Sequence, residues 1–211
     1  MSSIEEQVAR EYFERNGFFL KHLHIEPEMA ARVASTKKNK TAKHYPAYLI
    51  QRQTGRSQHE PLAGRFQLFS SDLGGLAFAV MVVVGWSSQG LTLPIFLNGG
   101  RYRSWIRNEV VPSFNLSLLG LDKEAHPPGV PHKIILLPGL PVTEPYRQEC
   151  IDLLKAAGAD ALFSFQTFFE SLVSQVPTGS GQATSDLSEI VRLLKVYELV
   201  RPPQMDLFED F

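Results

Sequence analysis

The strongest constraint on the fold of this chain is a run of nine apolar residues, Leu76 to Val84, that carries no charge. The run is short for a helix and ends in the β-branched triplet Val82-Val83-Val84, so it predicts a strand buried on both faces. His132 to Leu137 has the same character and stops at Pro138-Gly139. Strands of this kind lie inside sheets that helices cover on both sides. The sequence therefore predicts an α/β fold, with a central mixed β-sheet that has a parallel portion and is flanked by helices.

The other elements are predicted from their periodicity and end signals. A helix is expected over 3–16, because Ile4, Val8 and Tyr12 recur on one face and Gly17 follows where a helix end favours positive φ. We further expect strands over 18–25, 45–51, 91–97 and 161–165, and helices over 102–111, 143–158, 165–175 and from 185 onward. The predicted order alternates strands and helices, as an α/β sheet requires.

The chain is expected to form one α/β domain over 1–176, followed by a Pro/Gly/Ser-rich linker over 177–184. Residues 185–211 are expected to form a helix and an acidic tail that pack on this domain as a C-terminal helical extension. Within the domain, Pro46 either starts the strand over 45–51 or places it at a sheet edge, because proline cannot donate to a ladder.

Composition restricts the environment of the protein. The single cysteine, Cys150, excludes an intramolecular disulfide and a cysteine-rich zinc module. The start of the chain, Met1 to Glu6, is acidic and polar, unlike a signal peptide. The nine-residue apolar run at 76–84 is about half of what a membrane-spanning helix needs. We therefore expect a cytoplasmic protein that has no membrane partner.

Motifs of the common catalytic and cofactor sites are missing. His22 and His24 would share one face of a strand, but no third ligand stands at a helpful spacing, so two surface histidines are the simpler interpretation. The stretch 85–90 (GWSSQG) lacks the second glycine of a nucleophile elbow. Gly99-Gly100 lacks the dinucleotide-binding frame and indicates a turn. The sequence thus predicts no metal site and no cofactor.

Three stretches carry a resemblance to a known family. They are Asn16 to Leu20 (NGFFL) after the opening helix, the apolar strand that runs into Gly85-Trp86, and the segment 185–200 (SDLSEIVRLLKVYELV). In these features the chain resembles a group of uncharacterised bacterial proteins of the restriction-endonuclease-like, PD-(D/E)xK nuclease superfamily. The resemblance implies a restriction-endonuclease-like fold, in which a leading helix precedes a mixed sheet flanked by helices.

The resemblance also implies that the active site is degenerate. Active members carry an aspartate on the second strand and a Glu-x-Lys on the third, just before Gly-Trp. Carried over, the Glu-x-Lys positions fall on Val82 and Val84, and the aspartate falls near Pro46 or Ala47. All three charged groups are lost. Glu5 or Glu6 would match the family's accessory acid. The resemblance thus implies a nuclease fold without nuclease chemistry, a pseudoenzyme.

An active site displaced from these positions is the alternative. From residue 30 to residue 108 the only acids are Glu60 and Asp72, whereas metal-dependent phosphodiester cleavage needs two or three converging carboxylates. Asp72 is the only nearby candidate for a displaced acid. The competing interpretation is that Asp72 caps the turn Ser70-Ser71-Asp72.

The net charge of −1 conceals a split along the chain. Residues 29–108 hold eleven basic and two acidic side chains, a local charge of +9, and the rest of the chain is acidic. The candidate nucleic-acid-binding residues are Lys37, Lys38, Lys40 and Lys43 in a polar loop, Arg52, and Arg101, Arg103 and Arg107 interleaved with Tyr102 and Trp105. Pairing of these arginines with acids inside the fold, and a merely solvated lysine loop, is the competing interpretation.

The sequence thus favours a non-catalytic nucleic-acid-binding protein that contacts the backbone of DNA or RNA. One alternative is an interaction module that forms a homodimer or a complex with another protein through its C-terminal helix and the tail residues Leu207, Phe208 and Phe211. The other is a metal-dependent phosphodiesterase with a displaced active site.

Overall fold

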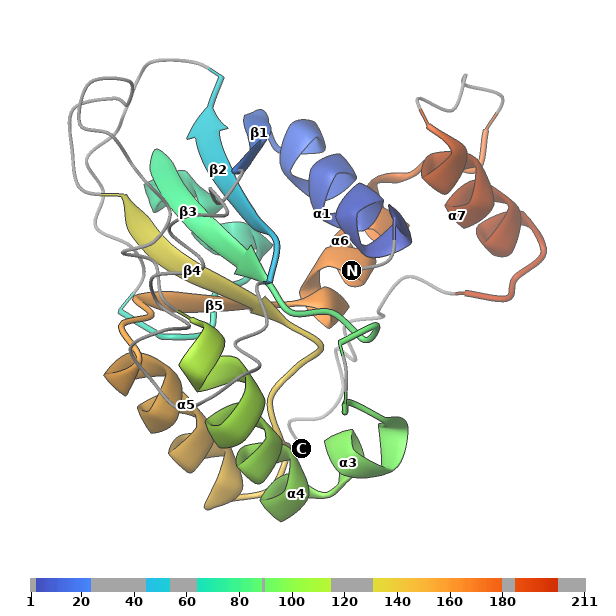
Figure 1. Ribbon diagram of the computed structural model, residues 1–211. Helices are drawn as coiled ribbons and strands as arrows, with labels where there is room; N and C mark the ends of the chain where they lie inside the picture. The colour runs from blue at the N-terminus through green and yellow to red at the C-terminus, as the bar shows by residue number, and fades with distance from the viewer. Residues whose placement is uncertain are drawn as a thin grey trace, which may run out of the picture.

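The computed structural model describes residues 3–23, 45–53, 64–88, 90–114, 131–179 and 185–200. Their centre is a five-stranded sheet in the order β1-β2-β3-β4-β5 (Figure 1). The strands are β1 (Phe18–Leu23), β2 (Ala47–Arg52), β3 (Phe78–Val83), β4 (His132–Leu137) and β5 (Ala161–Ser164). β1, β2 and β3 pair antiparallel, and β3, β4 and β5 pair parallel. The predicted α/β fold with a mixed, partly parallel sheet is confirmed.

Helices cover both faces of the sheet (Figure 1). One face carries α1 (Ser3–Arg15), α6 (Phe165–Gln175) and α7 (Asp186–Val196). The other carries α4 (Gly99–Trp105), its π-helical continuation η2 (Ile106–Val110) and α5 (Tyr146–Ala156). Three short helices, α3 (Leu93–Leu97), η1 (Ser70–Gly75) and η3 (Val111–Ser113), complete the described elements. Side chains of the sheet therefore divide between two hydrophobic cores.

Strand β3 shows the division most clearly. Met81 and Val83 belong to the core under α1 and α6, whereas Val80, Val82 and Val84 belong to the core under α4 and α5. Every residue from Ala79 to Val84 is buried, as predicted for a strand covered on both faces. Because successive side chains of a strand point to opposite faces, the residue number decides which core a side chain joins.

Helix α1 follows its apolar periodicity with one exception. Val8 and Tyr12 are fully buried, and Gly17 ends the helix with φ of +78°, as predicted. Ile4 was expected on the same face but is 61% exposed, because it lies in the first turn, beyond the core. Tyr12 stacks on Phe168 of α6 with ring centroids 3.8 Å apart, so α1 and α6 are joined through aromatic rings.

One predicted element differs from the structure, and of the two alternatives for Pro46 the strand start is confirmed. The stretch 91–97 was expected to be a strand, but Leu93–Leu97 is the short helix α3. Pro94 lies in the first turn, where a missing N–H removes no helical hydrogen bond, so the proline favours a helix start. Pro46 starts β2, which lies inside the sheet and not at its edge, and the Pro46 carbonyl accepts a hydrogen bond from the Val83 N–H at 2.9 Å.

Helix α7 packs on the same face as α1 and α6. The Ser185 hydroxyl caps it by accepting from the Ser188 N–H, and Leu187 and Val191 are buried in the core shared with α1. The Ser188 hydroxyl donates to Glu11 of α1 at 2.6 Å and accepts from Arg15 at 2.7 Å. The acidic tail and most of the 177–184 linker lie outside the described residues. No helix in the described part of the chain is both long enough and apolar enough to cross a membrane.

Candidate functional site

The predicted basic residues have very different surroundings. Lys37, Lys38, Lys40 and Lys43 lie outside the described residues. Arg52 ties β2 to the turn η1: its Nε donates to the Leu76 carbonyl at 3.1 Å, its Nη2 donates to the Leu73 carbonyl, and its guanidinium lies over the Phe18 ring. Arg52 therefore stabilises the fold and does not present its charge to a ligand.

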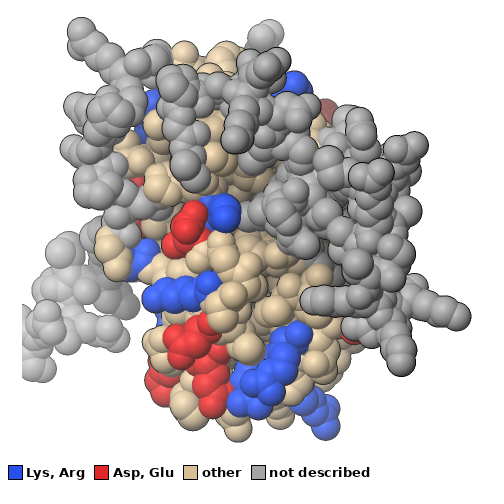
Figure 2. All heavy atoms as spheres, turned by 60° about the vertical axis from the view of Figure 1, so that its left-hand side comes forward, with Lys and Arg blue, Asp and Glu red and all other residues tan. Residues whose placement is uncertain are grey.

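Arg103 also has a partner within the fold. Its Nη1 lies 2.5 Å from Glu149 Oε2, so this ion pair joins α4 to α5. The hydrogen bond to Glu149 raises the pKa of the Arg103 guanidinium above its usual value. Figure 2 shows basic and acidic side chains next to each other in the lower half of the view, where α4 and α5 lie. For Arg103, the structure supports the interpretation of pairing with an acid inside the fold, whereas Arg52 is held by backbone carbonyls and not by an acid.

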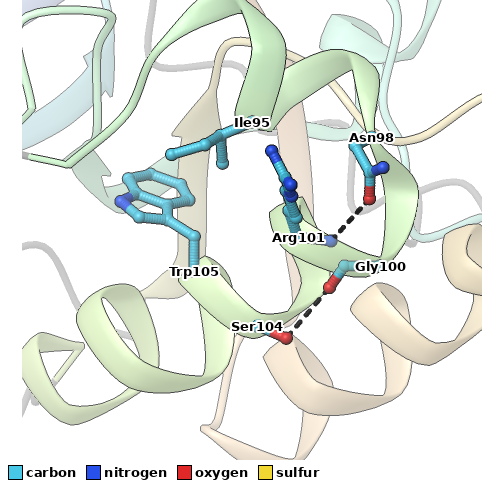
Figure 3. A pocket seen from close by; sticks show the side chains of 6 residues that line it. All are labelled: Ile95, Asn98, Gly100, Arg101, Ser104 and Trp105. Atoms are coloured by element: carbon cyan, nitrogen blue, oxygen red, sulfur yellow. Dashed lines mark hydrogen bonds between the residues drawn. The ribbon is translucent and has the colours of Figure 1, made fainter.

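Arg101 and Arg107 differ from these two residues. Both are exposed, and neither forms an ion pair with another described residue. Arg101 lines an open cleft of about 600 Å³ beside α3 and α4 (Figure 3). The lining consists of Ile95, Asn98, Gly100, Arg101, Ser104 and Trp105. Arg107 follows in the π-helical turn η2. The predicted basic patch thus contains two free cations within the described part of the chain.

The cleft is built on a rigid helix. The Asn98 side chain caps α4 by accepting from the Arg101 N–H at 3.0 Å, and the Ser104 hydroxyl donates to the Gly100 carbonyl at 2.9 Å. In Figure 3 the Arg101 side chain lies between Asn98 on one side and Ile95 and Trp105 on the other. The helix therefore presents a cation, an amide and a hydroxyl at fixed spacing.

Two inward-facing aromatic residues anchor α4. Tyr102 stacks on Trp105 with ring centroids 5.5 Å apart, and its hydroxyl donates to the Gly139 carbonyl at 2.9 Å. Both residues belong to the core over β3 and β4, and the Trp105 indole also forms part of the cleft. Among the described residues, the lining carries one positive charge and no carboxylate. Such a cleft suits an anion that is attached to an apolar or flat group.

Sequence reasoning missed the polar partners of Arg101. Gly99-Gly100 was expected to be a turn, but it forms the first turn of α4. Two glycines weaken the helical signal, so the predicted helix began only at Tyr102 and Asn98 was not recognised as its N-cap. The asparagine before the glycine pair was the available signal, because asparagine is among the preferred N-cap residues.

The three positions to which the resemblance assigns the catalytic residues lie close together. Ala47 and Val82 are direct partners in the β2–β3 ladder, and Val84 follows on the same face. All three are buried in the core under α4 and α5. No group of three or more His, Cys, Asp or Glu side chains that could hold a metal occurs among the described residues.

The resemblance matches the accessory acid with Glu5 or Glu6, and Glu5 reaches the turn that directly follows Val84. Helix α1, which carries Glu5 and Glu6, packs on the opposite face of the sheet. Glu5 is buried and accepts hydrogen bonds from the Ser87 N–H at 3.2 Å and the Ser87 hydroxyl at 2.6 Å. A Cβ at Gly85 would lie 2.2 Å from Glu5 Cδ, so this glycine gives the carboxylate its space. The hydrogen bonds between Ser87 and Glu5 therefore connect the turn after β3 to α1.

The contacts of Asp72 and His22 support a structural role for both residues. Asp72 Oδ2 accepts from the Phe69 N–H at 2.8 Å, and Arg65 holds both carboxylate oxygens. Asp72 lies in η1 before the start of β3, whereas Val82 and Val84 stand at its other end, so the turn-capping interpretation of Asp72 is the one supported. The His22 ring contacts Tyr48 edge to face, and His24 lies outside the described residues.

Comparison with protein families, with curated proteins and with solved structures found no match to this chain.

Proposed function

We propose that this protein binds DNA or RNA without cleaving it, and that the cleft beside α3 and α4 contacts the nucleic acid. The observation that carries the proposal is Arg101, an exposed cation that has no ionic partner among the described residues and lines a cleft with Trp105. Arginine binds phosphate oxygens in a forked geometry, so Arg101 can contact the backbone of a nucleic acid. Arg107 adds a second cation along the same segment.

We further propose a restriction-endonuclease-like fold with a C-terminal helical extension. The leading helix α1 and the change from antiparallel to parallel pairing at β3 support this assignment. The apolar side chains at Ala47, Val82 and Val84 support a pseudoenzyme, because no metal ligand stands at any of these positions. A displaced phosphodiesterase site finds less support, since Asp72 is bound by Arg65 at the far end of β3.

Fluorescence anisotropy with labelled single-stranded DNA, duplex DNA and RNA tests the binding proposal. The intact protein should bind at low salt, with an affinity that falls as salt rises. The double variant Arg101→Gln and Arg107→Gln should weaken binding about tenfold and lower the salt slope by about two, one for each lost phosphate contact.

Arg10→Gln is the matched control, because Arg10 is a half-exposed arginine of α1 on the opposite face of the sheet, beside Glu6 and Glu14. It should leave the affinity unchanged. Absence of binding at low salt, or equal losses in the control and the double variant, would reject the α4 cleft as the binding surface. Incubation of plasmid with pure protein and Mg²⁺ or Mn²⁺ should give no cleavage, and metal-dependent cleavage would reject the pseudoenzyme assignment.

Self-association through α7 is the second candidate function. The outer side of this helix and the residues after it expose apolar side chains, namely Ile190, Leu193, Val196, Tyr197 and Leu199. Exposed apolar groups this close together favour contact with an equal surface on a second copy. Light scattering should then show a dimer that Ile190→Asp converts to a monomer. A monomer at all concentrations would reject this candidate.

A further inference from the structure

A second cavity lies at the carboxyl ends of the parallel strands β4 and β5. Its volume is about 250 Å³, and it is more enclosed than the α4 cleft. Residues from several distant segments line it, including Gln67, Phe96, Gly139, Thr143, Arg147 and Gln166. The carboxyl edge of parallel strands is the usual place for ligands in open α/β sheets, because the connecting loops and helix starts converge there.

The backbone brings the polar lining groups together. The segment around Gln67 pairs with β5, since Leu162 donates to the Phe66 carbonyl and Leu68 donates to the Leu162 carbonyl, each at 2.8 Å. Arg147 stands in the first turns of α5, and its N–H donates to the Thr143 carbonyl. Arg147 Nη2 donates to Gln67 Oε1 at 2.7 Å. A neutral amide therefore holds the guanidinium in the cavity wall.

The described lining residues of this second cavity carry positive charge and no negative charge. Arg147 is half-buried and is the only charged residue among the described lining residues, and it forms no ion pair with another residue of the described part of the chain. The amide oxygen of Gln67 occupies one of five N–H donors and neutralises no charge. The start of α6, with Ser164 and Gln166 in the lining, adds helix N–H groups that have no carbonyl partner inside the helix. All these groups favour a bound anion.

We propose that this cavity binds a small molecule through an oxyanion group, a carboxylate or a phosphate monoester, with Arg147 as the forked donor. The volume equals about eight water molecules at ~30 Å³ each, which fits a small organic acid or a phosphate ester. Phe96, Leu140 and Pro141 supply apolar contact for the carbon part of the ligand. This site is independent of the proposed nucleic-acid cleft, because the two linings share no residue.

NMR titration of ¹⁵N-labelled protein with inorganic phosphate and, separately, with succinate at constant ionic strength tests the proposal. The amide signals of Gly139, Thr143 and Gln166 should shift saturably with at least one of the two probes, and the tighter probe identifies the oxyanion class. Arg147→Gln should weaken binding about tenfold, as expected for loss of a charge-assisted pair. Absence of saturable shifts with both probes, or unchanged shifts in Arg147→Gln, would overturn the proposal.

A second variant guards against a folding defect in Arg147→Gln. Gln166→Asp places a negative charge at the cavity mouth while keeping a residue that suits the first turn of α6, so the fold should persist and oxyanion binding should weaken. Unchanged binding in this folded variant would also contradict the proposal. Arg101→Gln is the control: it should leave the phosphate and succinate titrations unchanged, whatever its effect on nucleic acid.

Discussion

The two faces of the sheet use aromatic residues in opposite ways. Under α1 and α6, the rings of Tyr12, Phe13, Phe18, Phe163 and Phe168 pack against one another and are fully buried or nearly so. On the other face, Trp86, Phe96, Tyr102 and Trp105 form a chain of ring contacts that begins at the surface and passes beside both cavities. On the first face the aromatic rings exclude solvent, whereas on the other face they reach the surface and lie beside the cavities.

Both proposed binding sites include residues of the α3–α4 segment. On the α1 face, the charged residues Glu11 and Arg15 bind each other and the Ser188 hydroxyl. Arg101 and Arg147, which form no ion pair with another described residue, both belong to cavity linings, Arg101 beside α3 and α4 and Arg147 at the carboxyl ends of β4 and β5. Substitutions on the α1 face should therefore lower stability, whereas substitutions at the cavities should lower binding. The predictions below test this separation.

The largest expected effect is on the closed face. Phe168→Ala removes a ring that contacts Tyr12, Phe13 and Phe163 in a core without solvent access, so it should lower the free energy of unfolding by about 3–5 kcal/mol. Phe169→Ala is the matched control on the same helix, because that ring is 42% exposed, and it should cost about 1 kcal/mol or less. Urea unfolding followed by circular dichroism measures both. Equal losses would contradict the assignment of a closed core.

The second largest loss of stability is expected at Gly85, which lies against the Glu5 side chain. Gly85→Ala places a methyl group within 2.2 Å of Glu5 Cδ and should destabilise the protein by about 1–3 kcal/mol through overpacking. Gly179→Ala has no atom within 4 Å of the added carbon and should change stability little. Thermal unfolding of the two variants measures the difference. A tolerated alanine at position 85 would mean that Glu5 does not hold the turn after β3.

Sequence reasoning recovered the sheet because its evidence is local. The β-branched run over 76–84 and the helix signals Gly17 and Ser185 each act on their own neighbours, and each matches the structure. It could not tell which arginines are free. Arg101 and Arg103 are two positions apart on one helix, yet Glu149, distant in sequence, binds only Arg103 among them. Pairing of that kind depends on the tertiary fold, which charge counting along the chain does not contain.

A third prediction is the acid sensitivity of the α1–α7 contact. Burial alone would raise the pKa of Glu11, but hydrogen bonds from Ser188, Ser185 and Arg15 and the charge of Arg15 lower it below the ordinary value of 4.5. Because the folded state holds the proton less tightly than the unfolded state, Glu11 stabilises the fold above pH 4.5 and loses this contribution as pH falls through its lowered pKa.

Ser188→Ala tests the origin of this stabilisation. Removing the hydroxyl should lower the free energy of unfolding at neutral pH by about 1–2 kcal/mol, and the loss should shrink in acid. Urea unfolding across the acidic range measures the difference between the variant and the intact protein. A loss that stays constant with pH would show that Ser188 acts by packing alone and not through the Glu11 carboxylate.

The smallest change in stability separates two neighbouring arginines. Arg103→Gln breaks a partly exposed ion pair between α4 and α5 and should lower the free energy of unfolding by about 1 kcal/mol. Arg101→Gln removes no ion pair to another described residue, so stability should change by less than about 0.5 kcal/mol. If Arg101 serves a ligand, the order reverses in the anisotropy measurement, where Arg101→Gln should weaken nucleic-acid binding more than Arg103→Gln. If Arg103→Gln costs more stability and Arg101→Gln costs more affinity, then Arg103 stabilises the fold and Arg101 contacts the ligand. Equal losses of affinity in the two variants would contradict the assignment of Arg101 to the binding surface.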